Sequence, residues 1–152
     1  DMNVILRHDT EQATSRCLYK GAVDGAGHSV FQGLIEVAPG ARQTDAYLSN
    51  RNLLLSTTAQ ADSIPCLRIA NNDVKCSHGS ASGRVNAEEL FYLQSRGLSS
   101  EEARAIIVQG FFAEVTDDLP ESIKARVLDG IAKKTGDENG VEILNREGKT
   151  DA

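Results

Sequence analysis

The chain has 152 residues and a formal net charge of −6, and this length suits one compact domain or a smaller domain with an appendage. No apolar stretch approaches the roughly 20 residues that span a bilayer, so a membrane-spanning role is not expected. Nucleic-acid binding is not expected either, because phosphate contacts need a clustered basic face and the excess charge is acidic.

The first part of the chain has the pattern of strands and turns. Short β-branched and apolar segments recur between turn-forming residues such as Asp24–Gly27 and Ala38–Gly40. Many short strands without crossover helices indicate a sandwich, a barrel or a coiled β-solenoid, and periodicity does not choose among them. The expected strands are Val4–His8, Ser15–Tyr19, Ser29–Val37, Asn52–Thr57 and Cys66–Ala70.

A thiol and an imidazole follow, two residues apart, at Cys76 and His78. On an extended backbone alternate side chains point to one face, so the two would project together and both could meet a soft metal. The pair is a weak signal by itself, because Cys17 and Cys66 form no second ligand pair and a metal would need ligands from elsewhere. A buried small thiol beside a hydrogen-bonded histidine is the open alternative.

From residue 86 the pattern becomes helical. Asn86 is the expected N-cap of a first helix, which Gly97 can close in a left-handed conformation. Ser99 and Glu102 have the spacing of a capping box that opens a second helix. The expected helices are Ala87–Ser95, about Ser100–Asp118, and Glu121–Lys134.

The second helix has an apolar arc too wide for one contact, with Ile107 and Phe111 in one stripe and Phe112 in another. We expect one side to pack on the β core and the other on the third helix. An ordinary helical core and a docking surface for a partner are both compatible with this arc. The third helix would use the stripe Ile123, Val127 and Ile131.

Six segments occur along the chain in a characteristic order: Val30–Ile35, Asn52–Ser56, Pro65–Ile69, Asp73–Gly79, Glu88–Leu98 and Glu102–Arg104. Together they resemble the SufB/SufD family of iron–sulfur cluster assembly proteins, over roughly Arg7 to Leu119. Where this chain has Lys75–Gly79, a SufB-like chain would be expected to carry a glutamate-rich segment. The chain therefore resembles the SufD branch of the family.

The resemblance implies the C-terminal part of a longer protein. The implied fold is a right-handed parallel β-helix over residues 1–85, followed by a small α-helical domain over residues 86–134. Residues 135–152, rich in Gly, Asn and charged side chains, are expected to form a mobile tail. A piece of a β-helix exposes a stacking face, so an isolated piece is expected to associate, with a homodimer as one expected form.

The resemblance also implies a scaffold function, in which transient iron–sulfur clusters are built and handed on. In the family a SufB-like partner adds ligands across an interface, and His78 matches the histidine of this side; Cys76 matches a cysteine that is either a ligand or an inter-subunit contact. Imidazole can leave iron on protonation, which suits a scaffold that releases its cluster.

The family resemblance assigns a second partner, a SufC-type ATPase, to the C-terminal helices. Ile107, Phe111 and Phe112 are the expected docking residues. The alternative function is a purely structural subunit that docks the ATPase and binds no metal.

No enzymatic activity is expected. Ser77 and His78 are adjacent, so on a strand they would diverge and could not form a nucleophile–base pair. Asp24–Gly27 lacks the lysine of a phosphate-binding loop.

The other histidines and cysteines are expected to be structural. His8 would bond to backbone, His28 would be exposed in a turn, and Cys17 and Cys66 would be core thiols. Three cysteines do not make a disulfide framework, and the odd number favours a reducing compartment. Cytoplasm is the expected location, with a plastid as the alternative that the family implies.

Overall fold

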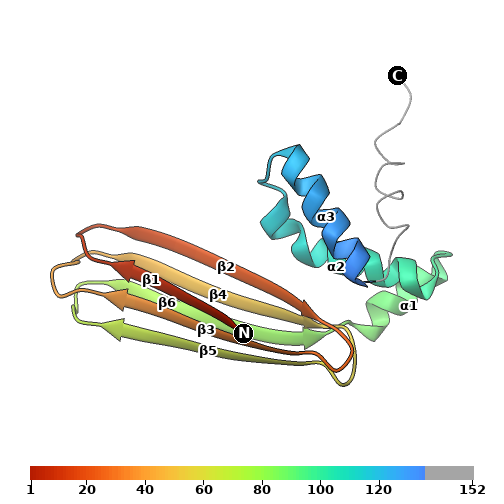
Figure 1. Cartoon of the computed structure of the whole chain (residues 1–152), viewed down its shortest axis with the longest axis horizontal. Helices are drawn as coiled ribbons and strands as arrows, with labels where there is room; N and C mark the ends of the chain where they lie inside the picture. Colours follow the sequence, from red (N-terminus) through yellow and green to blue (C-terminus); the bar gives the residue numbers. More distant parts are fainter. Residues whose placement is uncertain (136–152) are drawn as a thin grey trace. The chain divides into compact units, whose positions relative to one another are not determined.

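The computed structural model describes residues 1–135, which form two units that divide after Arg84 (Figure 1). The described strands all lie in the first unit and the described helices in the second. None of these helices is long and apolar enough to cross a membrane. The elements are β1 Met2–His8, β2 Thr14–Val23, β3 His28–Val37, β4 Asp45–Leu54, β5 Gln60–Ile69, β6 Lys75–Arg84, α1 Ala87–Ser95, α2 Ser100–Thr116 and α3 Glu121–Thr135.

The strands of the first unit alternate between two parallel sheets. One sheet has the order β1-β3-β5 and the other the order β2-β4-β6. Parallel neighbours need a long crossover, and each crossover here is a strand of the opposite sheet. The unit is therefore a β-helix-like stack of three coils, each made of one odd and one even strand. This confirms a mainly β fold with parallel coils, whereas its right-handedness stays a prediction.

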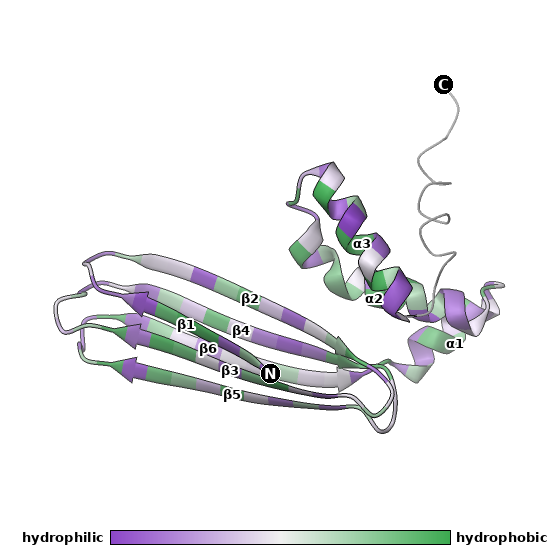
Figure 2. Ribbon diagram, viewed as in Figure 1, coloured by the Kyte–Doolittle hydropathy of each residue, from purple (hydrophilic) through white to green (hydrophobic). Residues whose placement is uncertain are grey.

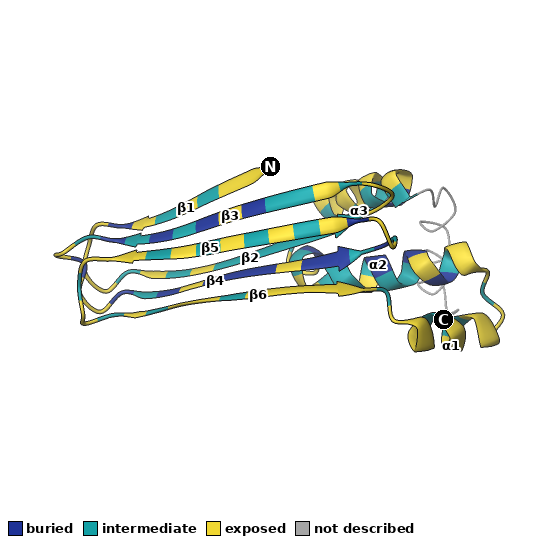
Figure 3. Ribbon diagram, turned by 90° about the horizontal axis from the view of Figure 1, so that it is seen from below, coloured by how far each residue is buried: buried dark blue, intermediate teal, exposed yellow. Residues whose placement is uncertain are grey.

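The core lies inside the coils, on the inward faces of β3 and β4 (Figure 3). Every second residue of a strand points inward, so apolar and polar residues are mixed along the strands (Figure 2). The rings of Tyr19 and Phe31 stack with centroids 4.9 Å apart. A Cβ atom at Gly33 would collide with Leu48 and with the Phe31 ring, which explains glycine there. The buried cluster comprises Phe31, Ile35, Val37, Ala41, Ala46 and Leu48.

Two strands differ from the expected positions. β4 begins at Asp45 and ends at Leu54, whereas the sequence predicts Asn52–Thr57. β6 follows the last expected strand and consists largely of Gly, Ser and Ala. β4 and β6 both contain residues of low β propensity. They are strands nevertheless, because each pairs in parallel with a neighbouring strand of the same sheet.

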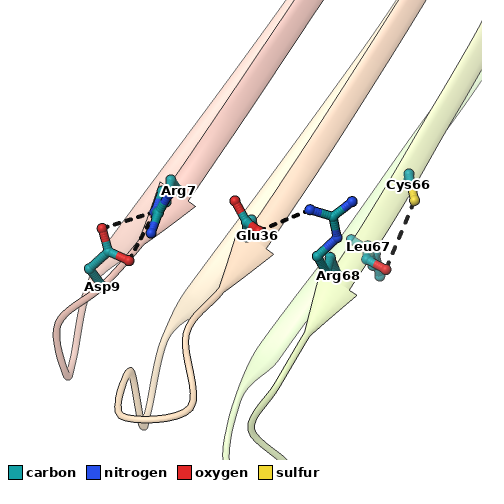
Figure 4. Close-up of polar contacts among 6 residues, drawn as sticks. All are labelled: Arg7, Asp9, Glu36, Cys66, Leu67 and Arg68. Carbon is teal, nitrogen blue, oxygen red and sulfur yellow. Dashed lines mark hydrogen bonds and ion pairs between the residues drawn. The ribbon is translucent and has the colours of Figure 1, made fainter.

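A row of charges crosses the outer face of the β1-β3-β5 sheet (Figure 4). Arg7, Glu36 and Arg68 are in register on neighbouring strands. Arg68 Nη1 lies 3.1 Å from Glu36 Oε1, and Arg7 Nε lies 3.1 Å from each of the two Asp9 carboxylate oxygens. The arginine side chains are exposed, so water screens these pairs and they contribute little to stability.

Cys66 lies on the same outer face, close to Arg68 (Figure 4), and is exposed. The prediction of a core thiol at this position is wrong, because the less exposed residues of β5 alternate with it, as at Pro65 and Leu67. Cys17 is half-buried and packs against the core, as predicted.

The helices of the second unit begin and end almost where the sequence predicts. Asn86 Oδ1 accepts a hydrogen bond from the Glu88 backbone N–H at 2.9 Å, which caps α1. Gly97 closes this helix at φ +97°. Ser99 and Glu102 form a reciprocal capping box at the start of α2. Local capping chemistry therefore sets these boundaries.

α3 packs through a different face from the predicted one. Ile123 and Val127 are exposed, so the expected packing of this stripe is wrong at these two positions. Ala132 is buried instead, and Lys124 is half-buried with its Nζ 2.8 Å from Asp117 Oδ1 at the end of α2. The less exposed side of α3 is therefore the side that bears Lys124 and Ala132, and not the side that bears Ile123 and Val127. Thr135 ends α3, and the rest of the predicted tail lies outside the described residues.

Candidate functional site

Cys76 and His78 lie on β6, which forms one edge of the β2-β4-β6 sheet. Cys76 is in register with Ala46, and His78 with Leu48. Ala46 and Leu48 are completely buried, and residues in register on parallel strands point in the same direction. Cys76 and His78 therefore share the inward face of the last described coil, as their spacing predicts.

The Cys76 thiol is half-buried and packs against the core cluster. Burial raises the pKa of this thiol above its ordinary value, and the backbone of Ala46 partly opposes the change. Only the thiolate is a strong metal ligand, so burial disfavours metal binding by Cys76 in this conformation. An opening of the coil that hydrates the thiol would remove this obstacle.

The His78 ring differs from the thiol because it is exposed, although it points to the same side of β6. Among the described residues no hydrogen-bond or ion-pair partner holds the ring. The pair thus combines the two interpretations of the sequence: Cys76 is a half-buried small thiol, whereas His78 is an exposed imidazole. An accessible neutral imidazole is a good ligand for iron, zinc or copper.

The ligand set at this strand is incomplete. No group of three or more His, Cys, Asp and Glu residues within residues 1–135 could hold a metal ion. In the same range β6 is hydrogen-bonded to β4 alone, so its other edge presents backbone N–H and C=O groups to a further strand. A metal at His78 would need ligands from a second polypeptide, and the open edge gives that polypeptide a place to bind.

The other histidines have partners within the chain. His8 is buried, and its Nε2 lies 3.0 Å from Ser15 Oγ, so its side chain bonds to a hydroxyl rather than to the backbone that the sequence predicts. His28 is exposed as predicted, and its Nε2 lies 2.7 Å from Asp62 Oδ2. Neither ring is brought close enough to Cys76 and His78 to form a larger cluster with them.

The three expected docking residues lie on α2. Ile107, Phe111 and Phe112 are all half-buried, and the two aromatic rings make an edge-on contact with centroids 5.1 Å apart. Their apolar surface is therefore partly used inside the helical unit. This leaves a smaller area of these side chains available to a partner.

The most exposed aromatic residues lie on α1 instead. Phe91 is 71% exposed and Tyr92 57% exposed, and the guanidinium of Arg96 lies 5.2 Å from the Tyr92 ring centroid. The sequence pattern by itself does not identify this pair as a surface. Adjacent residues lie about 100° apart around a helix, so a narrow contact on one face of α1 covers only one of the two rings.

Residues 1–111 match the family described as SUF system FeS cluster assembly, SufBD core domain. The chain is 42% identical over 135 residues to the iron–sulfur cluster assembly protein SufD of Escherichia coli, a match that covers 88% of this chain and 32% of that protein. It is 36% identical over 118 residues to SufD of Bacillus subtilis, covering 77% of this chain and 27% of that protein.

A plant protein is also similar to this chain. The chloroplastic protein ABCI7 of Arabidopsis thaliana is 39% identical over 118 residues, covering 77% of this chain and 24% of that protein. The chain thus spans about a third or less of the length of these relatives.

Proposed function

This chain belongs to the SufBD core family of the SUF system and is SufD-like, and on that premise we propose that it is part of a scaffold subunit for iron–sulfur cluster assembly. In this proposal the subunit pairs with a SufB-like subunit and with a SufC-type ATPase. It binds a nascent cluster transiently and passes it on, and it catalyses no reaction itself. The cytoplasm is the proposed location, with a plastid as the alternative.

The incomplete ligand pair on the open edge of β6 supports this proposal. Thiolate and imidazole are both ligands of iron–sulfur clusters. With only Cys76 and His78 available on this strand, a cluster bound here would be shared with ligands of the SufB-like subunit. A shared cluster is held only while the two subunits keep their interface closed, which suits a cargo that must leave.

The two side chains would have different parts in this process. His78 is exposed, so its ring would ligate iron without a prior movement of the strand. Cys76 is half-buried with a raised pKa, so it would bind iron only after movement at the interface hydrates it. ATP-driven closure of the ATPase, transmitted through the helical unit, is the proposed cause of that movement.

The proposed docking surface for the ATPase is the helical unit. Ile107, Phe111 and Phe112 remain its predicted residues, and the exposed pair Phe91 and Tyr92 adds a larger accessible aromatic surface. Glu88 and Glu89 lie in the first turn of α1, so a partner that binds this helix would present basic residues around an apolar pocket.

The second candidate function is a structural subunit that completes the complex and binds no metal. The half-burial of Cys76 against the core favours this candidate, since the thiol already has a packing role. The two candidates differ in what His78 does.

Iron and acid-labile sulfide in the anaerobically purified three-component complex would separate the candidates. The full-length parent of this chain would be compared with its His78→Ala variant and with His28→Ala, which removes an exposed imidazole that pairs with Asp62. We expect His78→Ala to lose most of both elements and His28→Ala to keep them, with assembly and ATPase activity unchanged in both. Equal contents in all three proteins would support the structural subunit.

A further inference from the structure

A row of in-register positions with small or polar residues crosses the inward face of the β2-β4-β6 sheet. Gly21, Asn52 and Ser82 are in register on the three strands. Asn52 Nδ2 donates to Asn50 Oδ1 at 2.7 Å along β4 and lies 3.3 Å from Ser82 Oγ across to β6. Gly21 makes room for this amide, because a Cβ atom there would lie 2.9 Å from Asn52 Oδ1.

The side chains of Asn50 and Asn52 are not expected to stabilise the folded state. Asn50 is 1% exposed and Asn52 4% exposed, yet Asn50 Nδ2 and Asn52 Oδ1 have no hydrogen-bond partner within the described part of the chain. An unsatisfied polar group in the interior is unfavourable, and apolar side chains of similar volume would avoid it. The amides therefore need another reason to be there, and buried polar groups are known to fix the register of packed elements.

The register of β6 needs such a device. Residues 79–83 of this edge strand are Gly, Ser, Ala, Ser and Gly, so bulky side chains contribute little to the choice of one register over the next. The backbone hydrogen bonds of a ladder are the same in every register. A shift by one residue would turn every side chain of the strand to the opposite face.

We infer that Asn50 and Asn52, acting through Ser82, hold β6 in register and so keep Cys76 and His78 on the inward face of the coil. The three are positioning residues, since none has a place in the ligand set itself. A shift by one residue would move Cys76 out of the core and bring its neighbour Ser77 inward. The inference about the register of β6 does not depend on the proposed function. Only its consequence for iron binding rests on that proposal.

Thiol reactivity reports this shift directly. In the full-length parent, pulsed alkylation with N-ethylmaleimide followed by peptide mapping would give separate rates for Cys17, Cys66 and Cys76. Cys66 is exposed and Cys17 half-buried in β2, so they serve as internal references. A second protein with Ser77→Cys would carry a thiol on the face of β6 opposite to that of Cys76.

The variants are Asn52→Leu and Ser82→Ala, with Ser82→Thr as the conservative change that keeps the hydroxyl. Ser82 is exposed, so its replacement is compatible with folding. Ser15→Ala is the matched control, because it removes the interior bond between Ser15 and His8 without touching β6.

We expect Asn52→Leu and Ser82→Ala to accelerate the labelling of Cys76 about tenfold, which corresponds to about 1.4 kcal/mol. The labelling rate of the thiol introduced by Ser77→Cys should decrease in the same variants. Ser82→Thr and Ser15→Ala should leave the labelling rates of both thiols unchanged. Opposite changes at neighbouring positions are the signature of a shifted strand. Unchanged labelling of Cys76, or equal acceleration of Cys17 and Cys76 with a lower Tm, would overturn the inference.

Discussion

His78 occupies, in the last described coil, the position that Leu48 occupies in the coil before it. Leu48 is completely buried, whereas the imidazole is exposed. An inward-facing polar ring thus stands in a column that is otherwise apolar, since Cys17 precedes Leu48 in the same register. Such a side chain is unfavourable for a closed core and useful at an interface where another molecule completes the site.

Removal of the imidazole should therefore leave the fold unaffected. We expect His78→Ala to change the free energy of unfolding of the full-length parent by no more than about 0.5 kcal/mol, because the ring is exposed and makes no bond within residues 1–135. Urea denaturation followed by circular dichroism measures this. A much larger loss would assign His78 a structural role and would weaken the iron assignment.

Cys76 should make stability depend on pH in the alkaline range. Its pKa is raised in the folded state by burial, so the folded protein retains the thiol proton more strongly than the unfolded chain does. The stabilisation is complete below the ordinary pKa of 9.0 and is lost as the pH rises through the folded pKa. Unfolding in urea at a series of pH values should show this decline in the parent.

The decline should be smaller in Cys76→Ala and unchanged in Cys66→Ala, which removes the exposed thiol. Identical pH profiles for the parent and Cys76→Ala would show that the burial of this thiol has no energetic consequence.

Gly33 and Gly83 should respond differently to the same substitution. In Gly33→Ala the new methyl group would collide with Leu48 and the Phe31 ring, and such overpacking costs about 1–3 kcal/mol. A Cβ atom at Gly83 would have no described atom within 4 Å, so Gly83→Ala should be close to neutral. Equilibrium unfolding of the two variants decides this, and equal stabilities would contradict the interior packing described for β3 and β4.

The exposed aromatic pair on α1 should contribute to ATPase docking without contributing to folding. We expect Phe91→Ser with Tyr92→Ser to weaken binding of the SufC-type ATPase at least tenfold, about 1.4 kcal/mol, with unchanged helicity. Ile123→Ser is the control, since Ile123 is also exposed but lies on α3. Isothermal titration calorimetry measures the affinities, and equal affinities for the parent and the double variant would exclude α1 from the docking surface.

The half-buried residues of α2 should behave differently from that pair. Phe112→Ala removes a ring that packs on Phe111, so we expect a loss of about 1–3 kcal/mol in stability together with weaker binding. Thermal unfolding and calorimetry on the same preparation would show both effects. A stable variant with full affinity would remove Phe112 from the predicted docking residues.

Local chemistry made the helices predictable from the sequence. Asn86, Ser99 and Gly97 act within a few residues of the boundaries that they set, so their roles need no knowledge of the rest of the chain. The common face of Cys76 and His78 was predictable for the same reason, because alternation is a property of a single strand.

The errors concern features that only the stacked coils determine. Cys66 has apolar neighbours in the sequence, but its register with Leu34 on the outer face decides its exposure. β4 contains Asn50 and Asn52, whose types disfavour strands, and its two neighbouring strands supply the pairing that makes it one. The face by which α3 packs depends likewise on its contacts with α2, which the sequence of α3 alone does not determine.

The path of the coils also makes the candidate site depend on the strands that precede it. β6 has only β4 as a template within the described chain, and β4 itself lies against β2. Within the described chain, the strand that bears both proposed ligands is therefore held in place through its pairing with β4. A chain in which β2 and β4 are not folded would not place Cys76 and His78 on a common inward face. The geometry of the candidate site therefore requires the preceding strands to be folded.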